Sequence, residues 1–209
     1  MVQLAGLLCL LAVGSPDAAA TPWYQDWTGI RAAAVAVKTI ETAFVQTRHL
    51  RILRKPLVSR GVMAYRRPND LRWEYQSPLQ TLLLVRGGVV ERLIKHGGQW
   101  VPDASARLEA MKIVIGEISL WLDGNFAASK TFRAELRPAG KGEPPHVELV
   151  PLDKSLGKII SRIAIRFGER PGTVTAIDIF EAGEGVTHIA FENARYGEAI
   201  PDARFAAPH

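Results

Sequence analysis

Residues 61–78, GVMAYRRPNDLRWEYQSP, carry the strongest structural signal in this 209-residue chain. Two short runs lie on either side of a polar break. Each is rich in aromatic and branched residues and alternates with a period of two, which predicts strands. The break Pro68-Asn69-Asp70 predicts a turn, because proline fixes one backbone dihedral and the Asn and Asp side chains bond their own backbone. The segment therefore predicts a β-hairpin with basic residues around its turn.

The same segment resembles the signature of the LolA family, the periplasmic carriers of outer-membrane lipoproteins. In that family a strand led by glycine ends in a basic residue followed by arginine and proline. A strand with tryptophan and then a further proline come next. The matching residues are Gly61, Arg66, Arg67, Pro68, Leu71, Trp73 and Pro78. Weaker matches extend the resemblance over nearly all of the chain after residue 20: Phe44-x-Gln46, Leu149-Val150-Pro151, Ile200-Pro201-Asp202, Phe205 and Pro208.

Size and composition are those of one globular domain. Hydrophobic residues make up 47% of the chain and charged residues 22%, which argues against disorder. The formal net charge of +5 favours anionic partners, namely phospholipid headgroups, acidic protein surfaces or nucleic acid.

The N-terminus is typical of a secretory signal peptide. Leu4–Val13 is an apolar run too short to cross a bilayer, and Ala18–Ala20 supplies the small residues of a cleavage site. Cys9, the only cysteine, lies inside that run, so a domain without it would have no disulfide bond. We expect a signal peptide at 1–20, a LolA-like lipid-carrier domain at 21–209 and a periplasmic location.

Periodicity predicts the remaining elements. A helix is expected to start at Trp27 or Thr28, and a second helix is expected within 104–122, ending at Asp123-Gly124. Besides the two hairpin strands, strands are expected near 40–53, 81–85, 89–94, 131–136, 147–152, 159–167, 174–181 and 187–193.

These elements predict an α+β fold that is mostly antiparallel β. The resemblance implies an incomplete, half-open β-barrel of about ten to eleven strands, with an N-terminal helix and a helical lid. Acyl chains would occupy any volume that lid and sheet leave unfilled, since each buried methylene contributes about 0.8 kcal/mol. The candidate cargo-binding residues are Leu108, Met111, Ile115, Ile118 and Leu122 of the lid, with Trp73 and Phe44 of the sheet. The same residues would also serve as an ordinary solid core.

Two features in the basic part of the chain have alternative interpretations. By family resemblance, Arg67 gates the cavity by holding the lid; otherwise it is a turn cation bonded to nearby carbonyls. Asp70 is the only acid among the cations of residues 48–72. These cations suit solvated strand edges, an anionic membrane or acidic partner, or nucleic acid.

No enzyme signature is present. The five histidines, at positions 49, 96, 146, 188 and 209, lack metal-ligand spacing, and there is neither a Gly-x-Ser-x-Gly elbow nor a P-loop. We expect no catalytic residues, no metal and no cofactor.

The expected function is therefore a monomeric carrier that moves lipoprotein acyl chains, or a related hydrophobic cargo, from the inner to the outer membrane. The resemblance implies an inner-membrane release complex as donor and an outer-membrane lipoprotein as acceptor, with no role for nucleic acid. The alternatives are a lipid-sensing or binding module on the same scaffold, or a small pathway-specific carrier or enzyme for a hydrophobic metabolite such as a polyene pigment.

Overall fold

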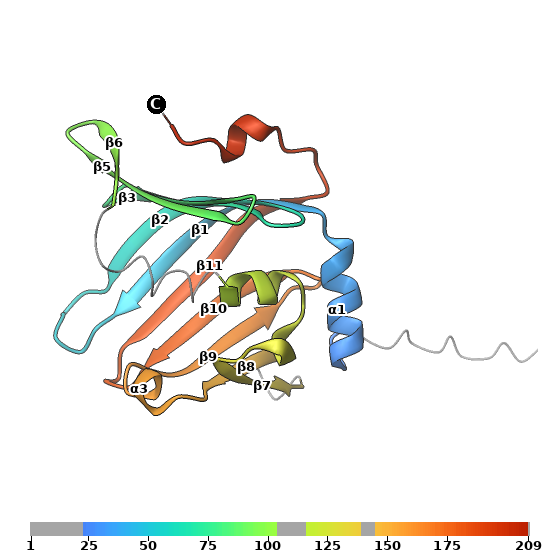
Figure 1. The fold of residues 1–209 in the computed structure, drawn as a ribbon. Coiled ribbons are helices and arrows are strands. Elements are labelled where there is room, and N and C mark those ends of the chain that lie inside the picture. Colours follow the sequence, from blue (N-terminus) through green and yellow to red (C-terminus); the bar gives the residue numbers. More distant parts are fainter. Residues whose placement is uncertain (1–22, 104–115, 139–144, 209) are drawn as a thin grey trace, which may run out of the picture.

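The computed structural model describes residues 23–103, 116–138 and 145–208 (Figure 1). The predicted signal peptide at 1–20 lies outside the described residues, as do three of the predicted lid residues, Leu108, Met111 and Ile115.

A single antiparallel sheet of eleven strands forms the body of the molecule, in the order β6-β5-β4-β3-β2-β1-β11-β10-β9-β8-β7. Within the described residues no pairing joins β6 to β7, so the sheet bends without closing (Figure 1). This confirms the predicted half-open barrel. The strands are β1 (Thr39–His49), β2 (Leu57–Arg66), β3 (Asp70–Ser77), β4 (Thr81–Arg86), β5 (Val89–His96), β6 (Gln99–Pro102), β7 (Phe132–Arg137), β8 (His146–Pro151), β9 (Ile160–Phe167), β10 (Val174–Glu181) and β11 (Val186–Tyr196).

Helices cover one end and the concave side of this sheet. The helix α1 (Trp27–Ala36) stands across one end (Figure 1), and its first turn is capped by Asp26, whose side chain accepts a 2.7 Å hydrogen bond from the Gly29 amide. Residues 116–122 are also helical and pack against the main core. The short elements are α3 (Lys154–Gly157) and the 3₁₀ turns η1 (Phe126–Ala128) and η2 (Asp202–Phe205).

The predicted hairpin is confirmed. Arg66 at the end of β2 lies opposite Asp70 at the start of β3, and Met63 lies opposite Trp73. One prediction elsewhere was wrong, and two elements were missed. The strand expected over 40–53 ends at His49, and Ile52 lies in a loop with 89% of its surface exposed. The strand β6 and the short helix α3 were not predicted.

The two faces of β4 are both covered, as its continuous apolar run predicts. Leu83 and Val85 belong to the main core on the concave side, whereas Leu82 and Leu84 pack with Leu93 of β5 in a separate cluster. Over the neighbouring strands, the outer face is covered by the C-terminal segment 197–208, whose Ile200 and Phe205 bury Ala64 of β2.

Charged groups fix this C-terminal segment on the sheet. The Arg66 guanidinium donates to Asp202 Oδ1 at 2.7 Å and to the Ile200 carbonyl at 2.9 Å. Arg72, also on the outer side, donates to Glu74 Oε2 and to the Ala206 carbonyl. The hydrogen bond and charge of Arg66 hold the pKa of Asp202 below its usual range. The segment is therefore attached by ionised groups as well as by apolar burial.

Gly61 occupies the tightest point of the sheet. It lies between Phe44 on β1 and Tyr75 on β3, and a Cβ atom placed there would be 2.1 Å from the Glu74 carbonyl oxygen and 2.4 Å from Cζ of Phe44. Only a residue without a side chain fits at these distances. The conformation of the Phe44 ring therefore depends on glycine at this position.

We predict that Gly61→Ala lowers the free energy of unfolding by about 1–3 kcal/mol, because the added methyl group forces the Phe44 ring and the β3 backbone apart. Urea denaturation measures the change. The matched control is Gly183→Ala, where the new methyl group meets nothing within 4 Å. Equal destabilisation of the two variants would contradict this account.

A second prediction concerns pH. Because folding lowers the pKa of Asp202, its stabilising contribution is complete above the ordinary carboxyl pKa of about 3.9 and is lost as pH falls through the lower folded-state value. Asp202→Asn should therefore be less stable than the wild-type protein at neutral pH, and the difference should shrink at acid pH. Urea titrations of both proteins across that range measure it. A difference independent of pH would exclude the ionic attachment.

Candidate functional site

The concave side of the sheet and the helical residues 116–122 line a cavity of about 850 Å³. That volume lies within the range of about 300–1,000 Å³ typical of ligand pockets. Most of the lining is apolar and comes from both halves of the sheet. The apolar lining includes Val37, Ile40, Met63, Tyr65, Trp73, Leu83, Ile118, Trp121, Leu122, Leu156, Ile160, Ile163, Ile165, Val174, Ile177, Ile179, Ile189 and Phe191.

The β9–β11 wall of the cavity is built from alternate residues of three neighbouring strands. Ile177 on β10 lies opposite Ile165 on β9 and Ile189 on β11, and Ile179 lies opposite Ile163. Side chains of a strand alternate between its two faces, so these residues share the concave face. Branched side chains in register leave an even apolar surface with no hydrogen-bonding group.

Of the cargo-binding residues that were predicted from the sequence and are described in the structure, three line the cavity and one does not. Ile118 and Leu122 line the cavity from the helix, and Trp73 lines it from β3. Phe44 is not part of the wall. It is 1% exposed and lies in the core, with its ring centroid 4.9 Å from that of Trp73 and 5.0 Å from that of Tyr75. On β1 it shares the concave face with lining residues such as Gln46, and the rings of Trp73 and Tyr75 pack against it.

Polar groups are few and lie at separate points of the lining. Tyr75 donates a 2.8 Å hydrogen bond to Gln46 Oε1, and burial raises the pKa of its hydroxyl. Glu117 accepts a 3.0 Å bond from Ser129 at Oε1. Its Oε2 atom and the indole Nε1 atom of Trp121 are buried and have no hydrogen-bond partner among the described residues. Both atoms have almost no accessible surface, so they are enclosed by protein and do not face the open cavity.

Arg67 connects the two helices that cover this cavity. Its Nε donates to the Val37 carbonyl and its Nη2 donates to the Ala34 and Leu122 carbonyls, each at 3.0 Å. Its Nη1 pairs with Asp123 at 2.6 Å. The C-terminal carbonyls of a helix lack partners within the helix and carry partial negative charge, so one guanidinium stabilises both helix ends. The bonds go to the helices and not to the hairpin turn.

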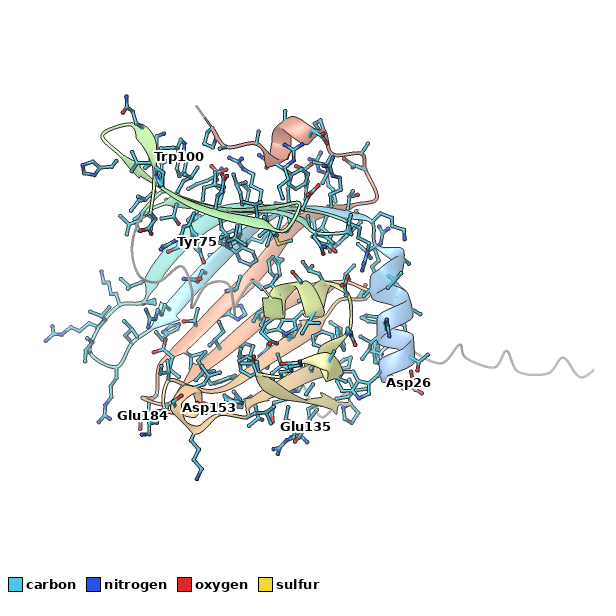
Figure 2. The ribbon with its side chains drawn as sticks, in the orientation of Figure 1. Asp26, Tyr75, Trp100, Glu135, Asp153 and Glu184 are labelled. Atoms are coloured by element: carbon cyan, nitrogen blue, oxygen red, sulfur yellow. The ribbon has the colours of Figure 1, made fainter. Side chains whose placement is uncertain are left out.

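The far end of the cavity is lined by the β8–β9 connection. Asp153 caps α3 by accepting hydrogen bonds from the Ser155 hydroxyl and the Ser155 and Leu156 amides, which lower the pKa of Asp153. Leu156 and Ile159 line the cavity here, although Ile159 is 65% exposed. Figure 2 shows Asp153 and Glu184 at the end of the sheet opposite Asp26, which begins α1.

Sequence reasoning missed the isoleucines of β9–β11 as site residues. Their alternation marks a buried face but does not show whether that face meets side chains or a void. Within the described ranges, no three His, Cys, Asp or Glu side chains are grouped to hold a metal ion. None of the helices seen in those ranges has the length and apolar character needed to cross a membrane.

Comparison with known proteins finds a relative in sequence and similar solved structures. A curated outer-membrane lipoprotein carrier protein of Dechloromonas aromatica (strain RCB) is 29% identical over 171 residues, covering 80% of this chain and 76% of the relative. A solved chain of the Pseudomonas aeruginosa MucA/MucB complex is similar in fold, with a TM-score of 0.53 and 13% identity over 88% of this chain and 61% of that chain. A LolA superfamily protein of Nitrosomonas europaea aligns with a TM-score of 0.43 and 11% identity, over 86% and 97% of the two chains.

The family model for the outer membrane lipoprotein carrier protein LolA matches residues 35–208, which include every strand of the sheet. This protein belongs to the LolA family of outer-membrane lipoprotein carriers.

Proposed function

We propose that this protein is a periplasmic carrier that takes up the acyl chains of lipoproteins and shuttles them from the inner to the outer membrane. The observation that supports this most is the apolar cavity of about 850 Å³ between the sheet and its helical cover. Membership of a carrier family supports the same role. The carrier would act by binding and release, without changing its cargo chemically.

The physics of such a cavity suits transfer between membranes. Moving a methylene group from water into an apolar site contributes about 0.8 kcal/mol, so a few acyl chains bind well against water. Moving the same chain from a bilayer into the cavity changes little, because both surroundings are apolar. Exchange with a membrane protein or a bilayer is then reversible, which a carrier requires.

The lining of the cavity is mostly apolar, so acyl chains would supply most of the contact with a bound cargo. Ile118, Leu122 and Trp73 would contact the acyl chains, together with Leu108, Met111 and Ile115 of the lid and with Phe44 as support.

Arg67 would act as the gate in this proposal. Its four contacts hold α1 and residues 116–122 together over the cavity, and separating the helices requires those contacts to break. The proposal also includes a removable signal peptide at 1–20, a monomeric domain at 21–209, a donor complex in the inner membrane and an acceptor lipoprotein in the outer membrane.

The first test narrows the cavity. Ala194 lines it from β11, and Glu192 on the same strand is exposed. Ala194→Trp should weaken binding of a fluorescent fatty-acyl probe about ten-fold, which corresponds to excluding about two methylenes at 0.8 kcal/mol each. Glu192→Trp adds the same ring outside and should bind like the wild-type protein. Unchanged binding by a folded Ala194→Trp protein would place the cargo elsewhere.

The second test weakens the contacts that hold α1 and residues 116–122 together. Arg67→Lys retains the charge but cannot repeat the four contacts. We expect amide hydrogen exchange in residues 116–122 to accelerate by roughly ten- to a hundred-fold, since hydrogen bonds to a charged group contribute about 1.5–3 kcal/mol. Dissociation of the acyl probe should also become faster.

The matched control for this test is Arg60→Lys, which changes an exposed cation on β2, the strand that precedes Arg67. It should alter neither measurement. Faster exchange without faster probe release would assign Arg67 a purely structural role.

A further inference from the structure

Large apolar side chains are exposed mainly at one end of the molecule. Seven of the ten that are exposed in the described residues belong to three connections, and the most exposed is Ile52 at 89%. These seven are Ile52, Leu53, Leu57 and Val58 around the β1–β2 loop, Leu79 between β3 and β4, and Leu152 and Ile159 beside α3.

The strand pairing brings these connections to the same end. Arg48, near the end of β1, lies opposite Leu57 on β2 and Thr187 on β11, so the loops after β1 and before β11 are neighbours. Two ion pairs join them, Arg48 with Glu181 at 2.8 Å and Arg51 with Glu184 at 3.3 Å. In Figure 1 the β1–β2 loop and α3 both project at the end opposite α1.

Unpaired cations accompany the apolar side chains. Residues 50–60, LRILRKPLVSR, contain four cations and no acid. In the described part of the chain Arg54, Lys55 and Arg60 have no carboxylate partner and are exposed, and Lys154 and Lys158 flank the short helix α3. By contrast Arg66, Arg67 and Arg72 pair with Asp202, Asp123 and Glu74. The basic run therefore divides into arginines that pair with carboxylates inside the fold and cations near the β1–β2 loop that do not.

An anionic bilayer suits both properties of this end. Apolar side chains at a loop tip enter the boundary between headgroups and acyl chains, and Lys or Arg beside them meet the lipid phosphates. An acidic protein surface would satisfy the cations but would leave side chains as exposed as Ile52 in contact with polar groups. The cavity also reaches this end, because Leu156 and Ile159 of the β8–β9 connection line it.

We propose that this end of the barrel, formed by residues 50–60, Leu79 and residues 152–159, docks on an anionic phospholipid surface and directs one end of the cavity towards the membrane. This goes beyond cargo carriage. Membrane docking needs no cargo and would hold for any hydrophobic ligand of the cavity.

The test is co-sedimentation of the protein with vesicles of phosphatidylcholine alone or mixed with phosphatidylglycerol. The protein should partition onto the mixed vesicles and dissociate as salt is added. Replacing both Arg54 and Lys55 by Gln should weaken partitioning on the order of twenty-fold, since each cation near an anionic surface contributes about five-fold. Ile52→Ser should weaken it about ten-fold through lost apolar contact.

Matched controls lie at the other end of the molecule. Val89→Ser removes an apolar side chain that is 61% exposed, and Arg31→Gln removes an exposed cation of α1. Both should partition like the wild-type protein, and all variants should bind the acyl probe equally. Equal partitioning onto both kinds of vesicle, no partitioning by folded protein, or equal losses in test and control variants would each overturn the proposal. If the folded wild-type protein did not bind the acyl probe, that result would instead count against the carrier function.

Discussion

The guanidinium of Arg67 joins the carbonyl ends of the two helical segments that cover the cavity. Three of its bonds go to the Ala34, Val37 and Leu122 carbonyls, and the fourth goes to Asp123. Without it, these carbonyls would lose a charged hydrogen-bond donor at the edge of an apolar cavity. The helical cover can therefore lie over the concave face without filling it, because its position is fixed by polar contacts at one edge and not by packing of side chains throughout.

The outer face of the β2–β3 hairpin is covered by packed side chains of the C-terminal segment, which lies directly on it. There the C-terminal segment closes over Ala64 and Arg72, and apolar packing of Ile200 and Phe205 is combined with ion pairs to Arg66. Consecutive arginines at the end of β2 thus serve opposite sides of the sheet: Arg66 fixes the outer segment and Arg67 fixes the inner helices. This division follows from the alternation of a strand and explains why the basic pair precedes the hairpin turn.

Most of the fold could be predicted because most strands carry a period-two pattern, β4 is a continuous apolar run, and the hairpin turn has its own chemistry. The errors have physical causes. Leu50 and Ile52 continue the alternation of β1 past its end, since an apolar side chain in an exposed loop looks the same in sequence as one on a strand. Strand β6 has four residues and little burial, so it gives almost no pattern. The cap at Asp153 could have revealed α3.

The site was less predictable than the fold. Trp73, Ile118 and Leu122 were identified from the family pattern and from helical spacing, and they do line the cavity. Phe44 was identified from the same family pattern yet does not line the cavity, because periodicity reports burial and not what a buried face meets. A void is the difference between the enclosed volume and the volume of the side chains, and that difference depends on the curvature of the whole sheet.

The two edge strands of the sheet determine whether its curvature is fixed. In a closed barrel, strand number and stagger fix the radius. Here β6 and β7 stand at opposite margins of the sheet and, in the part of the chain that the structure describes, each bonds to one neighbour only. The radius of this sheet is therefore not fixed by closure, and a change in the gap between β6 and β7 would break no hydrogen-bonded strand pair in that part of the chain.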